Sequence, residues 1–266
     1  MKVWAIANQK GGVGKTTTAI SLAGVMHNRG YRVLLIDLDP HGSLSSYLKL
    51  DPDDTEPSVY DLFYKTADVR SVVRQSEFEH ISFLPASTAL ATLDRRLGTK
   101  DGMGLVIKKT LTQLQHYFDY VLIDCPPMLG LLMVNALAAC DRLLIPVQTE
   151  FLALKGLERM LQTIRMIQKA RKQAINYMIV PTFYDKRLKA SNETLDTLRN
   201  SYADCIWDGY IPIDTLFRDS SRQGKPLSIM RPSCRGSRAY SHLLDHLEDK
   251  EADLSYQEME QESNEA

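Results

Sequence analysis

Long hydrophobic runs are absent from this chain of 266 residues. A membrane-spanning helix needs about 20 consecutive apolar residues and no such stretch occurs, so we expect no membrane insertion. The apolar part of the N-terminal segment MKVWAIANQK is too short for a secretory signal and leads directly into a glycine-rich loop. These absences predict a cytoplasmic protein.

Cysteine is scarce and scattered along the chain. The four residues are Cys125, Cys140, Cys205 and Cys234, and no two lie close enough in sequence for a zinc knuckle or a CxxC redox motif. An even number does not by itself indicate disulfides in a chain of this length, so we expect reduced thiols.

A surplus of one charge is also missing. The 32 Lys and Arg against 33 Asp and Glu leave a net charge of −1, so bulk charge does not predict nucleic-acid binding, although a local basic patch would support it. No linker rich in Pro, Gly or Ser interrupts the apolar segments, which favours one domain over residues 1–249. The acidic remainder, residues 250–266, is expected to be a frayed helix end or a disordered tail.

The sequence does contain a regular alternation of short apolar runs with longer segments of helical periodicity. Strands are expected at residues 2–8, 31–39, 80–87, 119–127, 141–148, 174–183 and 204–212, and helices at 17–30, 58–65, within 90–116, and at 152–170, 214–223 and 234–248. This order predicts an α/β fold, a single domain with a mostly parallel twisted sheet and helices on both faces. Ligands of such sheets bind beyond the carboxyl ends of the strands. The loops expected there follow Asn8, Asp37, Asp124, Val147 and Pro181.

The stretch NQKGGVGKTTT, residues 8–18, has the composition and the strand–loop–helix setting of a phosphate-binding loop (P-loop). Its glycines let backbone N–H groups turn toward phosphate oxygens, and the following helix adds its positive N-terminal end. The candidate nucleotide-binding residues are Lys10, Gly11, Gly12, Val13, Gly14, Lys15, Thr16 and Thr17. Lys15 suits the β- and γ-phosphates, Thr16 magnesium and Thr17 the α-phosphate. The loop departs from the common pattern, because Gln9 replaces a glycine and Lys10 is a second lysine.

Three aspartates follow buried apolar runs, and with Thr16 they form the candidate metal set. Asp124 ends YVLID, the form of a Walker B element, which holds magnesium, usually through water. Asp37 and Asp39 share one side of a strand end. Asp39 is suited to orienting or activating the attacking water, and Asp37 to holding a magnesium-bound water or a hydroxyl of the loop. The alternative is that one of the two caps the following helix.

Several segments together resemble the ParA/MinD family of deviant Walker ATPases. They are KGGVGKTT, DLDPHG, DYVLIDCPPMLGLLMVNAL, DRLLIPVQTEFLALKGLERML and GKPL…RPSCRGSRAY, in order over most of residues 1–247. The chain is more similar to the Soj-like ParA branch than to MinD, because no basic amphipathic helix ends it. The resemblance implies binding of ATP/ADP and Mg²⁺, an ATP-dependent homodimer, and slow hydrolysis that a partner protein stimulates.

The resemblance also implies roles for individual residues, with Lys10, Lys15 and Asp39 as the catalytic set. In the family, the lysine at the place of Lys10 reaches the nucleotide of the other subunit, and the aspartate at the place of Asp39 is the hydrolysis residue. A cation inserted from a neighbour complements phosphate charge only when two subunits meet, which couples dimerisation to ATP. Thr182 and Pro212 fall where strand-end loops of relatives contact adenine.

Two departures from typical ParA sequences narrow the interpretation. The pattern DPQGN becomes DPHGS, with His41 and Ser43, and EAPSHGKP becomes DSSRQGKP, with Arg222. His41 is expected to be a surface or helix-start residue rather than a catalytic base. The variants resemble the ParC-like branch encoded beside flagellar and chemotaxis genes. That resemblance implies positioning of chemotaxis arrays at the cell pole, with an array protein or polar adaptor as the activating partner.

Many ParA relatives bind DNA nonspecifically, and this chain has cations for such a role. The candidates are Lys186, Arg187, Lys189, Arg218 and Arg222, followed by Lys225, Arg231, Arg235 and Arg238. A basic stripe formed by them would place the protein on the nucleoid. Scattered, solvated charges are the alternative.

Three other functions stay open. One is a chromosome- or plasmid-partitioning ATPase that binds nonspecific DNA. Another is an enzyme related to amidoligases and dethiobiotin synthetase, which would phosphorylate a small carboxylate and condense it with an amine; Lys10 and the segment PVQTEFLALKGL argue against it. A metal-cluster carrier related to nitrogenase reductase would need further cysteine ligands beside Cys125.

Overall fold

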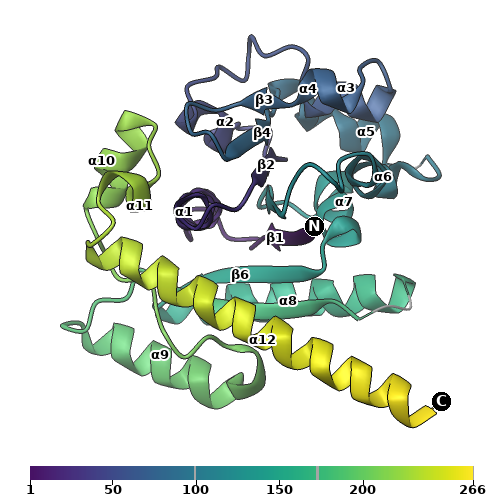
Figure 1. The fold of residues 1–266 in the computed structure, drawn as a ribbon. Helices are drawn as coiled ribbons and strands as arrows, with labels where there is room; N and C mark the ends of the chain where they lie inside the picture. The colour runs from purple at the N-terminus through teal and green to yellow at the C-terminus, as the bar shows by residue number, and fades with distance from the viewer. Residues whose placement is uncertain (99, 172–173, 266) are drawn as a thin grey trace.

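A seven-stranded sheet forms the centre of the computed structural model, which describes residues 1–98, 100–171 and 174–265, without the side chains of 170–171 and 251–265 (Figure 1). The strands are β1 (Lys2–Ile6), β2 (Val33–Asp37), β3 (Arg74–Gln75), β4 (Ile81–Leu84), β5 (Tyr120–Asp124), β6 (Arg142–Gln148) and β7 (Asn176–Thr182). Their order is β3-β4-β2-β5-β1-β6-β7, and only the β3–β4 pair is antiparallel. The predicted α/β fold with a mostly parallel sheet is confirmed.

The middle of the sheet sets up one edge for ligands. Every residue of β2 and β5 is buried, which is why their sequences, VLLID and YVLID, are apolar up to the final aspartate. The register places Asp37 opposite Asp124, and Ile6 of β1 lies opposite Asp124 on its other side. The carboxyl ends of these three strands therefore meet at one place.

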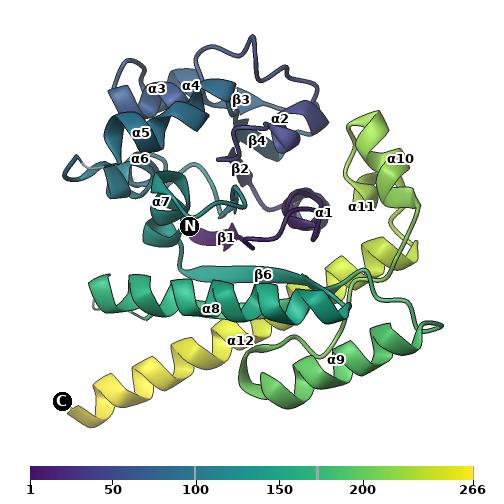
Figure 2. The same ribbon diagram turned by 180° about the vertical axis from the view of Figure 1, so that it is seen from behind.

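Helices cover both faces of the sheet (Figures 1 and 2). One core contains side chains of α1 (Lys15–Asn28), α2 (Ser43–Tyr47) and α12 (Arg235–Glu265), with α10 (Leu216–Gln223) and α11 (Leu227–Met230) packed against it. The other contains side chains of α3 (Val59–Tyr64), α4 (Val69–Val72), α5 (Leu93–Leu97), α6 (Val106–Thr112), α7 (Leu131–Ala139), α8 (Phe151–Arg171) and α9 (Lys189–Ser201). Short 3-10 helices lie at Thr88–Thr92, Met103–Leu105 and Ala203–Cys205. Successive strand residues alternate between the cores: Trp4 and Ile6 enter the first, Val3 and Ala5 the second.

Local signals set several helix boundaries. Ser58 is the N-cap of α3, and its hydroxyl accepts a hydrogen bond from the Tyr60 backbone N–H in a capping box with Asp61. Helix α1 ends at Asn28, and Gly30 follows it with φ of +81°, the left-handed conformation that favours glycine after a helix. Within the described ranges, no helix combines the length and the hydrophobicity that crossing a membrane requires.

The expected strand at residues 204–212 is wrong. Within the described residues, this segment forms isolated bridges, Ile206 with Ile179 and Pro212 with Tyr184. Its backbone hydrogen bonds to β7, from Trp207 N to Ile179 O and from Ile211 N to Pro181 O, are too far apart to make a continuous strand. Two-residue β3, conversely, is too short to give a sequence pattern. The backbone of α12 continues across the predicted boundary at residue 249. The side chains of the tail lie outside the description, so its proposed disorder stays a prediction.

Candidate functional site

The phosphate-binding loop lies between the end of β1 and the start of α1. Gly12 and Gly14 have φ of +73° and +93°, a backbone conformation that side chains other than glycine rarely adopt. Helix α1 begins immediately afterwards, at Lys15, so its free backbone N–H groups face the loop. The Lys15 side chain is largely buried, and its Nζ lies 3.5 Å from the Lys10 carbonyl oxygen. A lysine bent over a loop of this shape fits a bound polyphosphate.

The two strand-end aspartates lie side by side below this loop. Thr16 Oγ1 donates a hydrogen bond of 2.6 Å to Asp124 Oδ2, while the buried Asp124 Oδ1 has no partner within the described residues. Asp37 accepts hydrogen bonds of 2.8 Å from both the backbone N–H and the hydroxyl of Ser45, in α2. Asp37 therefore supports the following helix, the alternative named above, and also lies beside Asp124.

The charges of this pair favour a cation. Burial raises the pKa of Asp124, and the neighbouring Asp37 raises it further, against the opposing effects of Thr16 and Lys15. Burial also raises the pKa of Asp37, and the Ser45 hydrogen bonds limit that rise. Within the described residues, no three His, Cys, Asp or Glu side chains form a metal cage. The unpartnered Asp124 oxygen and the Thr16 hydroxyl instead fit Mg²⁺, which keeps several waters and uses phosphate oxygens as ligands.

Asp39 lies just beyond the pair, at the mouth of the site. Its Oδ1 is 3.0 Å from the His41 backbone nitrogen and 2.9 Å from His41 Nδ1. The His41 side chain is 81% exposed, in keeping with the expected surface position, yet it contacts the residue assigned to hydrolysis. The carboxylate remains close enough to solvent to meet a water molecule.

The Lys10 side chain contacts residues at and just after the end of β6. Its Nζ forms an ion pair with Glu150 and lies 3.0 Å from Gln148 Oε1. Gln148 in turn donates through Nε2 to the Gly12 carbonyl oxygen, at 3.1 Å. Sequence reasoning missed both partners. The end of β6 thus holds Lys10 aside in the single chain.

A cavity of about 650 Å³ opens next to the phosphate-binding loop. Gly14, Thr17, Thr182 and Pro212 all line it, so the structure brings the two predicted adenine-contact residues to the loop. Thr182 Oγ1 also donates to the Val13 carbonyl oxygen at 3.0 Å. Its position and size suit a nucleoside.

Phe183 lines the same cavity and was not predicted. It has a φ of +54°, which is strained for a bulky residue. One edge of its ring lies 3.5 Å from the place where a Cβ on Gly14 would be. The aromatic ring is thereby held over the loop, where it can cover a bound base.

The five candidate DNA-binding cations do not form one set. Lys186 and Arg187 line a second cavity, whereas Arg218 and Arg222 line the one beside the phosphate-binding loop. Three have acidic partners: Arg187 with Asp185 at 2.6 Å, Lys189 with Glu193 at 3.4 Å and Arg222 with Asp219 at 3.8 Å. The predicted basic stripe stays a prediction.

Exposed apolar side chains follow two of the strands whose carboxyl ends form the site. Met128 and Leu129 follow β5 and are 75% and 47% exposed, while Phe151 and Leu152 follow β6 and are 70% and 67% exposed. All four come after strands whose carboxyl ends form the site. We call them the apolar rim; apolar groups gathered in this way mark an interaction surface.

Comparisons with known proteins agree with this geometry. A family model described as an AAA domain matches residues 1–177. The chain is 35% identical over 243 residues to the sporulation initiation inhibitor protein Soj of Bacillus subtilis, covering 91% of this chain and 96% of Soj. It is 34% identical over 256 residues to the chromosome partitioning protein ParA of Caulobacter vibrioides, covering 95% of this chain and 96% of ParA.

A solved structure has a similar fold. It is described as cobyrinic acid a,c-diamide synthase from Mycobacterium smegmatis with bound ADP and magnesium. It matches with a TM-score of 0.81 and 33% identity, over 92% of this chain and 93% of that one. The phosphate-binding loop, the paired aspartates and the extent of these matches together show that the chain belongs to the ParA/MinD family of P-loop ATPases.

Proposed function

We propose that the protein is an ATP-gated dimer switch that positions cargo inside the cell. The observation that carries this proposal is the position of Lys10. Lys15 already serves the loop of its own chain, and Lys10 is held at the mouth of the site by Glu150. A lysine there complements phosphate charge only on a neighbouring subunit, so ATP in one chain favours contact with the other.

The apolar rim supports the same dimer. Its side chains follow β5 and β6, and Phe151 comes directly after Glu150, the ion-pair partner of Lys10. A second copy of the chain would bury them. Two nucleotides would then be enclosed between subunits. Water exclusion there strengthens each lysine–phosphate contact.

Each residue of the site has a separate role in hydrolysis. Lys15 neutralises phosphate charge, while Thr16 and Asp124 hold magnesium, which supplies Lewis-acid polarisation of the phosphoryl oxygens when bound. Asp39 orients the attacking water with Oδ2, the carboxylate oxygen that His41 does not contact. Asp37 fixes the position of α2 and adds negative charge beside Asp124. Turnover is slow until a partner completes this arrangement.

For the cargo, we propose chemotaxis arrays at the cell pole, on the basis of the DPHGS and DSSRQGKP variants. The relative from Caulobacter vibrioides is named a chromosome partitioning protein, which favours partitioning of a chromosome or plasmid as the alternative. Nonspecific DNA binding through the five candidate cations would serve either cargo. Tracking labelled arrays and labelled replication origins in a deletion strain separates the two: only the true cargo is misplaced.

The dimer switch is tested by measuring mass and turnover together. Light scattering after gel filtration should give a monomer without nucleotide or with ADP and a dimer with ATP and Mg²⁺. Met128→Glu should block the dimer while fluorescence titration still detects ATP binding, because the rim lies outside the nucleotide cavity. A mass that is the same with ADP and ATP overturns the proposal.

An amidating enzyme is a second candidate, because the similar structure is described as a diamide synthase. Such an enzyme would use ATP to activate a carboxylate for attack by an amine. Its turnover of ATP would depend on that small substrate rather than on a partner protein. ATP hydrolysis by the purified chain alone, unchanged by glutamine, ammonia and dicarboxylates, excludes this candidate.

A further inference from the structure

A second cavity, of about 620 Å³, lies on the far side of a thin wall from the nucleotide cavity. We call it the Trp207 cavity. Pro212 and Ile213 line both cavities. Their segment is held by two backbone hydrogen bonds of 3.1 Å, from Tyr184 N to Ile211 O and from Ile213 N to Tyr184 O. The proposed hydrolysis of ATP assigns no role to this cavity, although Lys186 and Arg187 in its lining are two of the five candidate DNA-binding cations.

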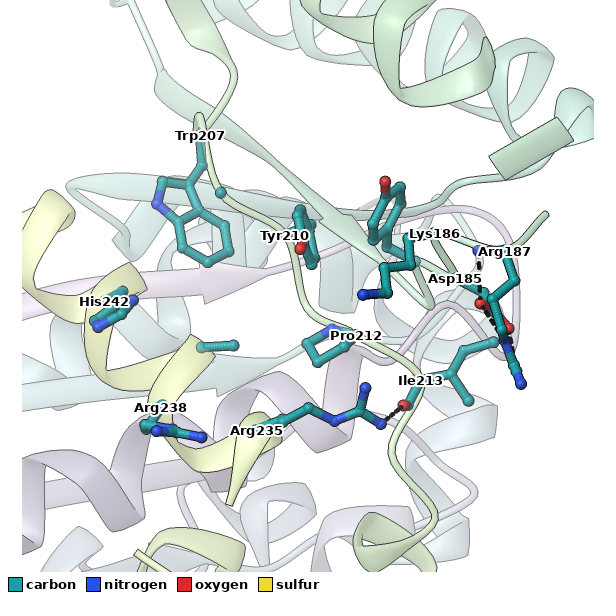
Figure 3. Close-up of a pocket in the computed structure, with 13 residues that line it drawn as sticks. Asp185, Lys186, Arg187, Trp207, Tyr210, Pro212, Ile213, Arg235, Arg238 and His242 are labelled. Carbon is teal, nitrogen blue, oxygen red and sulfur yellow. Dashed lines mark hydrogen bonds and ion pairs between the residues drawn. The ribbon is translucent and has the colours of Figure 1, made fainter. Parts of the chain in front are cut away.

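Aromatic side chains form one part of its surface (Figure 3). The rings of Tyr184 and Tyr210 have centroids 4.1 Å apart, and Tyr210 is 38% exposed. Trp207 is nearly buried, and the backbone of Gly209 passes so close to its indole ring that a Cβ would lie 2.3 Å away. The aromatic surface is therefore rigid, and Tyr210 presents part of its ring to solvent.

Cations form the other part. Lys186, Arg187, Arg235 and Arg238 line the cavity with one carboxylate, Asp185, and with His242. Arg187 pairs with Asp185 and lowers the pKa of that carboxyl to about 2. Arg235 donates to the Ile213 carbonyl oxygen, at 3.4 Å, and Figure 3 shows Lys186 directed into the cavity. Neither Lys186 nor Arg238 has an acidic partner within the described residues.

We propose that the Trp207 cavity binds an unpaired nucleotide, with its base on the Tyr210 ring and its phosphate between Lys186 and Arg238. A planar ring beside unpaired cations is the combination that recognises a base and its phosphate. The volume is within the range of small-molecule sites. Duplex DNA does not supply this ligand, because its bases are stacked inside the helix and its phosphates alone would need no aromatic surface.

The shared wall couples the two cavities. A ligand that packs against Tyr210 and Pro212 changes the freedom of the segment that also borders the nucleotide cavity. Linkage then requires a reciprocal effect, in which the nucleotide in the Trp207 cavity and ATP change each other's affinity by the same factor. The ATPase is thereby responsive to a second nucleotide.

The test first fills the nucleotide cavity and then titrates a probe into the Trp207 cavity. The protein is saturated with a non-hydrolysable ATP analogue and Mg²⁺, and fluorescent GMP is added as the probe. Tyr210→Leu and Arg238→Gln should each weaken probe binding by at least about tenfold. Tyr210→Phe, which keeps the ring, should bind normally. Tyr117→Leu and Arg159→Gln are matched controls, because both residues are exposed and lie outside the cavity.

Further titrations distinguish a free nucleotide from a nucleotide within a single strand. Tighter binding of a six-nucleotide dT strand than of GMP indicates a single strand as the natural ligand, and the reverse order indicates a free nucleotide. The proposal is overturned if the probe binds all variants equally, or if only duplex DNA binds and Tyr210→Leu is without effect. Binding of an acidic tyrosine-containing peptide with no binding of GMP or dT overturns it as well. Circular dichroism checks that each variant is folded, and the loading with ATP analogue separates this result from the dimer test.

Discussion

Lys10 and Glu150 form an ion pair within one chain, at the mouth of the phosphate-binding loop. The two residues are 140 positions apart, and Glu150 directly precedes α8. The pair holds the lysine that the proposed dimer needs for its partner. Dimerisation must therefore break this contact. The free energy lost with the ion pair opposes formation of the ATP-dependent dimer.

Replacing Glu150 should make the ATP-dependent dimer form more readily. Glu150→Gln removes the charge that retains Lys10, so we expect the ATP-dependent dimer to form at a protein concentration several-fold lower. A single exposed ion pair contributes up to about 1 kcal/mol, which corresponds to about fivefold. Analytical ultracentrifugation with ATP and Mg²⁺ measures the effect, and Glu193→Gln, in the exposed pair with Lys189, is the control. A weaker dimer would show that Glu150 acts across the interface instead.

Removing Lys10 itself should separate binding from stimulated turnover. Lys10→Ala keeps Lys15 and the glycine backbone, so ATP affinity should stay within a few-fold of the parent. Stimulated hydrolysis should fall by about a hundredfold or more, as when one preorganised charge is removed from a transition state. Nucleotide titration and phosphate release report the two quantities. Loss of both together would place Lys10 in the nucleotide site of its own chain.

Asp39→Ala should trap the ATP-bound dimer. Without the carboxylate the water is no longer oriented, so hydrolysis should drop by roughly a hundredfold while ATP stays bound. Gel filtration should then show a dimer that persists for hours after excess ATP is removed. Asp53→Ala, at an exposed loop position, should behave like the parent. Parental turnover in Asp39→Ala would exclude this aspartate as the hydrolysis residue.

The buried carboxylates should make nucleotide-free protein sensitive to pH. Asp124 has a pKa raised mainly by burial, so the folded chain binds a proton that the unfolded chain has already lost. Stability therefore falls as pH rises from the unfolded value of about 4 through the raised folded value. The thermal midpoint of Asp124→Asn should fall less over this pH range than that of the parent, by roughly 2–8 °C. Melting curves between about pH 5 and pH 9 in EDTA test this, and parallel curves would contradict it.

Phe183 should contribute to nucleotide affinity rather than to catalysis. Phe183→Leu removes the ring from the cavity wall but keeps an apolar side chain, so the KM for ATP should rise about three- to tenfold. The kcat should change less than twofold, because Phe183 lines the cavity proposed for the nucleoside and is not among the residues assigned to phosphate or magnesium. Steady-state kinetics measure both values. Phe183→Tyr is the conservative control, and an unchanged KM for Phe183→Leu would remove the assignment.

The sequence predicts what depends on neighbours along the chain. The phosphate-binding loop, the apolar strands and the N-cap Ser58 follow local rules, and the parallel order brings Asp37 and Asp124 together without further information. The partner of Lys10 is different, because Glu150 reaches it only through the packing of β6 beside β1. Phe183 has an ordinary sequence context, and only the loop around it imposes its positive φ. The 204–212 segment has strand-like composition, but its pairing is limited to isolated bridges, which composition does not reveal.

The hydrogen bond from Thr182 to the Val13 carbonyl oxygen has a consequence for how the molecule is divided. A fragment ending at residue 177, where the family model stops, would retain the loop and all three aspartates. It would lose Thr182, Phe183 and Pro212, and with them every predicted contact to the base. We therefore expect the first two thirds of the chain to hold phosphate and metal, and the last third to contact the base.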